Sequence, residues 1–169
     1  KNAPLFLKED AAAWKKSAEE WKKEKQPTSK KSEEALYEEA VRLMSLARSK
    51  QKFPMDRSAD IIYLRMTSVV HDLLRSYPES KHSADALFLL GLSYEVLHDL
   101  NLWTLHEMYY ESCIKKAPHT STAQGCYRQY EKTIYSGYSG SGGVSLPKDV
   151  LKKLGALETL AKVTPTKPQ

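Results

Sequence analysis

Cys113 and Cys126 are the residues of this chain best suited to covalent chemistry. They lie at similar distances on either side of Pro118, so two antiparallel helices joined at this proline would bring the thiols face to face. In an oxidising compartment, a disulfide between them would close a short loop and add roughly 3 kcal/mol to stability. Facing helix axes lie about 8–10 Å apart, which makes the bond geometry demanding, and free cysteines are usually small buried side chains. The sequence leaves both readings open.

Other patterns that could support catalysis or metal binding are weak. A metal site could use His106 with Cys113, which share one helix face, but no further ligands follow at metal-binding spacing. The Gly-Ser-Gly-Gly stretch at 140–143 is not a phosphate loop, because no Gly-Lys-Ser/Thr follows it and no strand is expected before it. No Ser-His-Asp or paired-carboxylate arrangement stands out. We therefore expect a protein that is not an enzyme and uses no metal or cofactor.

The hydrophobic pattern predicts that these residues are carried by helices. The chain has 169 residues, of which 41% are hydrophobic, and contains seven glycines and eight prolines. This length suffices for one compact domain with its own core. Between the prolines and polar turns, apolar residues recur at three- and four-residue spacing, as on one face of a helix. We predict an all-α fold without strands, with helices over about 5–25, 33–48, 58–77, 83–97, 103–116, 121–135 and 148–163.

The amino-terminal segment, residues 1–31, carries most of the net charge. It holds nine lysines and five acidic residues, whereas the whole chain has a net charge of +5. Trp14 and Trp21 lie one heptad apart and form a narrow apolar stripe on this charged helix. Three readings stay open: the stripe packs on the helices that follow, it contacts a partner or a second copy of the chain, or it lies on a membrane surface.

Nucleic acid and a membrane span are both disfavoured. A nucleic-acid binder usually spreads basic residues over a folded face, whereas the excess here sits in one lysine-rich segment. No stretch approaches the roughly 18 apolar residues needed to cross a bilayer. The chain begins at Lys1 and not at Met, which fits a processed, exported protein and equally a trimmed one.

A repeat motif appears in the middle of the chain. Leu87, Leu90, Gly91 and Tyr94 stand in the pattern Leu-x2-Leu-Gly-x2-Tyr on one expected helix. Glycine has a physical role in such a motif, since a residue without a Cβ lets a paired helix approach closely. The pattern is typical of the first helix of a tetratricopeptide unit, with leucine where tryptophan is usual.

The next helix continues the motif. His106 and Tyr110 stand four residues apart, and Pro118 follows eight residues later, as in the second helix of such a unit. Histidine stands where alanine is usual, and the turn between the two helices is three residues longer than in the motif. The chain thus resembles tetratricopeptide-repeat proteins, in particular those of bacterial cell envelopes. The match is good over 83–118, degenerate over 32–78 and partial over 119–136.

The resemblance implies a helical-hairpin scaffold that binds other proteins. We predict a basic helix and linker over 1–31, a repeat domain over 32–136, a Gly/Ser loop over 137–147, a capping helix over 148–163 and a loose tail over 164–169. In tetratricopeptide arrays the first helices of successive pairs line a concave groove. The groove residues expected on this basis are Asp85, Phe88, Leu92, Glu95, Arg128, Lys132 and Tyr135, with Trp14 and Trp21 as a second contact.

The expected partner is a protein subunit of a larger assembly. Small repeat subunits of extracytoplasmic respiratory enzyme complexes are similar to this plan, so we predict an extracytoplasmic adapter, with a cytoplasmic location as the alternative. A homodimer through the tryptophan-bearing helix is a further expectation. The alternative function is a receptor-like module for a small ligand or a peptidoglycan fragment, which a deep, closed pocket would favour over an open groove.

Overall fold

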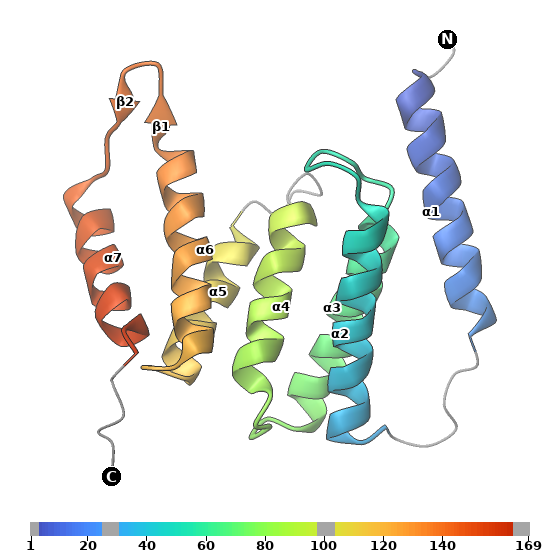
Figure 1. Cartoon of the computed structure of the whole chain (residues 1–169), viewed down its shortest axis with the longest axis horizontal. Helices are drawn as coiled ribbons and strands as arrows, with labels where there is room; N and C mark the ends of the chain where they lie inside the picture. The colour runs from blue at the N-terminus through green and yellow to red at the C-terminus, as the bar shows by residue number, and fades with distance from the viewer. Residues whose placement is uncertain (1–3, 25–30, 98–103, 164–169) are drawn as a thin grey trace. The chain divides into compact units, whose positions relative to one another are not determined.

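The computed structural model describes residues 4–24, 31–97 and 104–163. Over these ranges the chain is mostly helical and falls into two compact units, Lys1–Ser80 and Lys81–Gln169 (Figure 1). The elements are α1 (Leu5–Lys23), α2 (Glu33–Lys50) and α3 (Asp60–Ser76) in the first unit, and α4 (Ser83–Val96), α5 (Leu105–Lys116), α6 (Ser121–Gly137), β1 (Ser139–Gly140), β2 (Gly143–Val144) and α7 (Lys148–Ala161) in the second. The all-α prediction is thereby confirmed at the level of fold class.

The first unit is centred on the α2–α3 pair. Ser32 caps the amino-terminal end of α2, because its hydroxyl accepts a hydrogen bond from the Ala35 backbone N–H at 3.2 Å. Two glutamates occupy the first turn, where the helix dipole favours negative charge. Both helices pack along their length through residues at helical spacing, which are Leu36, Ala40, Leu43, Met44 and Ala47 of α2 and Ile62, Met66, Val70 and Leu73 of α3.

The α1 segment contacts the α2–α3 loop through Trp14 and contacts α3 through an ion pair of Glu24, the residue that follows α1. The Trp14 indole N–H donates to the backbone carbonyl of Arg57, and the Arg57 guanidinium lies 5.3 Å from the centroid of the same ring. Nearer the end of α1, Glu24 forms an ion pair with the buried guanidinium of Arg65. The tryptophan stripe thus has an intramolecular contact at Trp14.

The loop between α2 and α3 is organised by one buried carboxylate. Asp56 accepts hydrogen bonds from the backbone N–H of Lys52 at 2.8 Å and of Ser58 at 2.9 Å. The Gln51 side chain donates to the Pro54 carbonyl at 3.3 Å, which closes the turn from the other side. Burial by itself would raise the pKa of Asp56, but these backbone N–H groups, the Ser58 hydroxyl and the Lys52 charge together hold it below its usual value.

The lowered pKa of Asp56 leads to a pH prediction. A carboxyl whose pKa is lower in the folded state stabilises the fold above its unfolded pKa, and loses that contribution as pH falls through the folded pKa. We expect Asp56→Asn to lower the stability of the first unit by about 1–2 kcal/mol at pH 7, because the amide cannot accept both N–H groups equally well. Urea unfolding of both proteins at pH 7 and near pH 3 should show the gap shrinking at the lower pH. A gap that is equal at both values would contradict the assignment.

The second unit is built on the α4–α5 pair. The α-carbon of Gly91 faces the ring of Tyr110, so that a Cβ added to Gly91 would lie 2.3 Å from the Tyr110 Cε1 atom. The Tyr110 ring is fully buried, and its hydroxyl donates to Glu95 at 2.7 Å. The absence of a side chain at Gly91 is therefore what lets α4 and α5 approach this closely.

The next two helices close the second unit. Thr120 caps α6 by accepting from the Ala123 N–H, and a disulfide joins Cys113 of α5 to Cys126 of α6. The bond leaves neither cysteine free. α7 buries Leu154, Leu157 and Ala161 in the same core.

An ion-pair cluster also ties α7 to α5. Glu111 of α5 binds Lys153 of α7 at 2.6 Å and Lys115 of its own helix at 2.7 Å. Burial would raise the pKa of Glu111, but the two ammonium groups outweigh it and lower the pKa. The hydrogen bond to Glu111 in turn raises the pKa of Lys153. Both groups are therefore held in their charged forms.

The structure corrects one detail of the sequence prediction. The expectation of no strand was wrong: Ser139 pairs with Val144 and Gly140 with Gly143 in a short antiparallel hairpin. Gly143 has a φ of 97°, a conformation that favours glycine, so the Gly/Ser segment folds into a turn. The boundary between the compact units, after Ser80, falls inside the segment 32–136 that we predicted as one repeat domain. The predicted tail over 164–169 lies outside the described residues.

Candidate binding groove

A groove lies between α4 and α6 in the second unit. Its volume is about 580 Å³, and it is open to solvent. The lining residues are Asp85 and Phe88 from α4, and Ser121, Thr122, Gly125, Arg128 and Gln129 from α6. The residues from each helix recur at three- or four-residue spacing, so the groove is formed by one continuous face of each helix.

The floor of the groove is aromatic. The Phe88 ring is half-buried and lies over Gly125, where an added Cβ would be 3.5 Å from the ring. On its other side the ring packs at 57° against Tyr110, with the centroids 6.1 Å apart. Phe88 is thus held by the core beneath it and still presents part of its ring to the groove.

Polar groups flank this ring. At one end, the Thr122 hydroxyl donates to the Asp85 carboxylate at 2.8 Å, which fixes the position of the acid. Arg128 is exposed on the α6 side, and no ion pair to it is found within the described ranges. Farther along the same two helices, Lys132 lies 3.5 Å from Glu95, whose carboxylate also accepts from Tyr110. The groove therefore offers an apolar floor, a fixed carboxylate and an exposed guanidinium.

The structure brings together many of the residues predicted for the groove. Asp85, Phe88 and Arg128 line the cavity, while Glu95 and Lys132 pair across the same helices. Leu92 is only partly buried and packs on the core, and the exposed Tyr135 is set on the same face of α6 beyond Lys132, so neither lines the cavity. Trp14 and Trp21 belong to the first unit, as two half-buried residues of α1, and their role in a homodimer stays a prediction.

Sequence reasoning missed the small and polar lining residues of α6, which are Ser121, Thr122, Gly125 and Gln129. A signal for two of them was present. Counting back from Arg128 by three and seven residues along the helix face leads to Gly125 and Ser121. Such residues carry no hydrophobic or charge pattern of their own, so only the register of the helix could have identified them.

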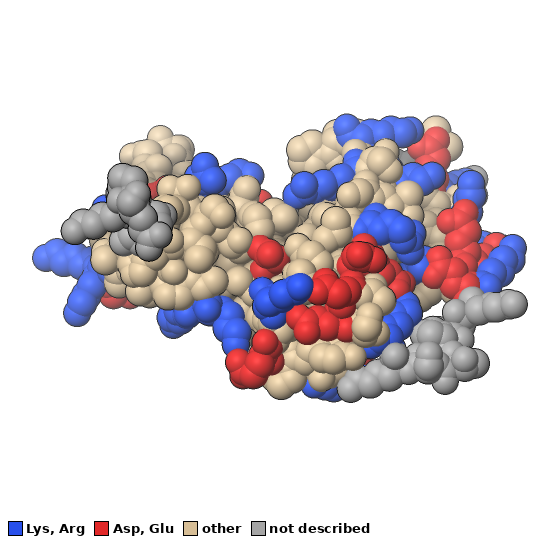
Figure 2. All heavy atoms as spheres, turned by 60° about the horizontal axis from the view of Figure 1, so that its bottom comes forward, with Lys and Arg blue, Asp and Glu red and all other residues tan. Residues whose placement is uncertain are grey.

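Basic and acidic side chains are interspersed on the face drawn in Figure 2, where several acidic residues gather between lysines and arginines. Over its described residues, that face thus carries both signs of charge.

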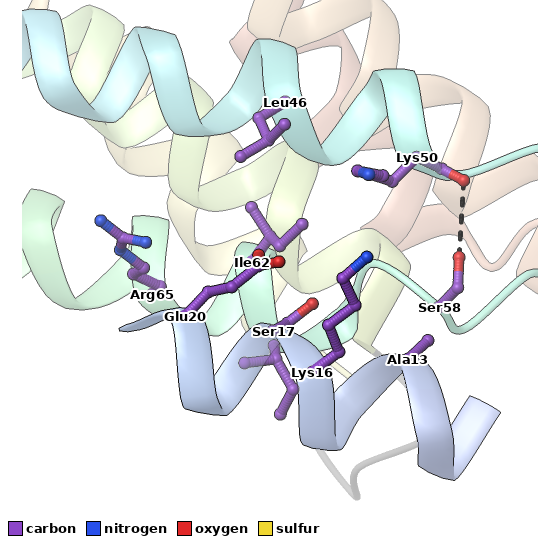
Figure 3. A pocket seen from close by; sticks show the side chains of 10 residues that line it. Ala13, Lys16, Ser17, Glu20, Leu46, Lys50, Ser58, Ile62 and Arg65 are labelled. Atoms are coloured by element: carbon purple, nitrogen blue, oxygen red, sulfur yellow. Dashed lines mark hydrogen bonds between the residues drawn. The ribbon is translucent and has the colours of Figure 1, made fainter. Parts of the chain in front are cut away.

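A second cavity, of about 340 Å³, lies within the first unit between α1 and the α2–α3 pair (Figure 3). Its walls are mainly apolar, from Ala13 of α1, Leu46 of α2 and the neighbouring isoleucines 61 and 62 of α3. Charged residues from all three helices complete the lining, namely Lys16, Glu20, Lys50 and Arg65, together with Ser17 and Ser58. The Ser58 hydroxyl donates to the Lys50 carbonyl at 3.4 Å at one end of this cavity.

The described parts of the chain contain no cluster of three or more His, Cys, Asp or Glu side chains that could hold a metal ion. None of the helices in these parts has the length and apolar character required to cross a membrane. Comparisons of the chain with protein-family models, curated proteins and solved structures found no significant match.

Proposed function

We propose that this chain is a non-catalytic, tetratricopeptide-like adapter that binds a segment of a partner protein in the α4–α6 groove. The observation that carries the proposal is the groove itself, with Phe88 on its floor between Asp85 and Arg128. Its open form suits a polypeptide, which can enter and leave along the groove. A rigid aromatic side chain and an arginine are also the residue types that most often dominate binding energy at protein interfaces.

The repeat assignment rests on the α4–α5 hairpin. In the tetratricopeptide motif, the small residue of the first helix permits close contact with the second, and Gly91 under Tyr110 has this geometry. The parallel placement of groove residues on α4 and α6 also follows the plan in which the first helices of successive pairs form the binding face. Both features support a short helical-hairpin array as the architecture of the adapter.

The disulfide supports an extracytoplasmic location. Structural disulfides persist in oxidising compartments and are rare in a reducing cytosol. With Cys113 and Cys126 bonded in the core of the second unit, the protein is best suited to an envelope or secreted assembly. In its narrowest form the proposal is a subunit of a respiratory enzyme complex, similar to the small repeat subunit that accompanies nitrite oxidoreductase.

Site-specific photo-crosslinking tests the groove. We expect a benzophenone amino acid in place of Arg128 to capture one discrete polypeptide in extracts of the source cell, with mass spectrometry identifying it. The matched control is the same group in place of Lys152, which is exposed on α7 outside the groove. With the purified partner, Arg128→Glu should weaken binding by tenfold or more, as loss of an interface arginine typically does. Equal capture from both positions would contradict the proposal.

The second cavity favours an alternative function. Its apolar walls in the first unit could hold a small ligand, as in a receptor-like module. A peptidoglycan fragment is the polar extreme of that class and fits these walls less well than an apolar molecule. Calorimetry with purified muropeptides tests the peptidoglycan form of this alternative, because the adapter proposal expects no heat of binding from them.

A further inference from the structure

The loop between α2 and α3 displays two large apolar side chains to solvent. Phe53 is 58% exposed and Met55 is 67% exposed, on either side of the exposed Pro54. The side chains of Lys50 and Lys52, just before them, are exposed as well. Scattered single apolar residues are normal on protein surfaces, but a phenylalanine and a methionine at one loop tip next to two lysines form a combined apolar and basic feature.

This loop is held in a fixed conformation. The buried Asp56 carboxylate binds the backbone on both sides of the tip, through the N–H groups of Lys52 and Ser58. The Asp56 N–H donates in turn to the Phe53 carbonyl at 3.0 Å. These bonds pair backbone N–H and carbonyl groups within the loop and fix its conformation. In this conformation the side chains of Phe53 and Met55 lie in solvent and not in the core. A preorganised loop also loses less conformational entropy on binding.

The exposed charges of the tip itself are positive. The only carboxylate of the loop, Asp56, is buried beneath it, whereas Lys50 and Lys52 are exposed. Lys16 of α1 lines the same cavity as Lys50, with Glu20 one turn farther along α1 (Figure 3). The first turn of α1, which points to the same end of the first unit in Figure 1, exposes Leu5 and Leu7. Apolar tips and lysines therefore share this end of the unit.

We propose that this loop docks on the surface of a bilayer that contains anionic lipid. Phe53 and Met55 insert among the headgroups, while Lys50 and Lys52 contact the lipid phosphates. Basic residues close to an anionic membrane are each attracted to it, and a few inserted apolar side chains strengthen the contact.

The size of the tip favours a lipid surface over a protein. The two exposed side chains offer on the order of 250 Å² of apolar area, well below the roughly 800 Å² that each partner buries in a stable protein interface. A membrane surface requires no such shape-matched area, because headgroups rearrange around a small apolar wedge. The proposal concerns the first unit and is independent of the groove in the second.

Vesicle sedimentation with the full chain tests the proposal. The probe is vesicles of phosphatidylcholine with about 30% phosphatidylglycerol, at low salt and at about 0.15 M salt. We expect the wild-type chain to bind these vesicles and to bind pure phosphatidylcholine vesicles at least tenfold less. Salt should weaken the binding to the anionic vesicles. Phe53→Ser/Met55→Ser and Lys50→Glu/Lys52→Glu should each lower the partition coefficient roughly tenfold or more.

Matched controls come from the second unit. Tyr138→Ser/Val144→Ser removes two exposed apolar side chains, and Lys148→Glu/Lys152→Glu makes the same change in net charge. Both should bind vesicles as the wild type does, and circular dichroism of all four variants should show unchanged helix content. The proposal is overturned if the wild type fails to sediment with anionic vesicles, in which case a protein partner for the loop is the remaining reading. It is equally overturned if loop variants and controls bind alike.

Discussion

Replacing Gly91 with alanine should lower the free energy of unfolding of the second unit by about 1–3 kcal/mol, the usual range for overpacking a core. The added Cβ would lie 2.3 Å from Cε1 and 2.4 Å from Cδ1 of Tyr110, distances at which one of the groups must move. The ring has little freedom to do so, because it is fully buried, packs on Phe88 and donates its hydroxyl hydrogen bond to Glu95. Alanine is a better helix former than glycine by about 1 kcal/mol, and we expect the clash to outweigh this gain.

Gly155 is the matched control for this substitution. It lies in the interior of α7, and a Cβ added there would have no atom within 4 Å. Gly155→Ala should therefore raise stability, by up to about 1 kcal/mol, through helix propensity alone. Urea unfolding followed by circular dichroism gives both values. If Gly91→Ala were also stabilising, the close approach of α4 and α5 would have to be abandoned.

Gly91 also shows how much of the fold the sequence contains. The Leu-Gly pair and the tyrosines at 94 and 110 form a pattern that predicts a close crossing of two helices. The contact between Gly91 and Tyr110 has that geometry. Helix bounds were predicted to within a few residues, since prolines and a capping residue such as Ser32 mark where helices stop and start. Local patterns of this kind act over one or two turns and are therefore visible in sequence.

The groove was predictable only in part. Helix spacing, combined with the plan of a tetratricopeptide array, placed Asp85, Phe88 and Arg128 on facing helices. The threonine and glycine that complete the lining give no such signal. Whether a residue lines the cavity or packs beside it, as Leu92 does, depends on side-chain packing between helices distant in sequence.

Contacts to the backbone of residues distant in sequence were beyond sequence reasoning. The stripe of Trp14 and Trp21 was visible, but the acceptor of the Trp14 N–H is a backbone carbonyl, which every residue possesses. The short hairpin at 139–144 was missed because its strands are very short. Each of its strands has two residues, too few for the alternating pattern that identifies a strand.

Loss of the disulfide should have the second large effect. The bond links residues 13 apart in sequence, and closing a loop of about this size restricts the unfolded chain enough to stabilise the fold by about 3 kcal/mol. We expect Cys113→Ala/Cys126→Ala to lose at least this amount, because both sulfurs are fully buried and their removal also leaves space in the core. The loss should be confined to the second unit, since both cysteines belong to it.

Reduction separates the cross-link from the lost volume, because dithiothreitol breaks the bond and keeps both sulfur atoms in place. Reduced wild-type chain, with reduction verified by thiol alkylation after unfolding, should melt at a lower temperature than the oxidised chain. The double alanine variant should melt at the same temperature with or without dithiothreitol. Hydrogen exchange read by mass spectrometry locates the effect: on reduction, amides of α5 and α6 should exchange faster, whereas those of α2 and α3 should keep their rates. A reduced wild type as stable as the oxidised one would show that helix packing alone holds α5 against α6 and that the disulfide adds no stability.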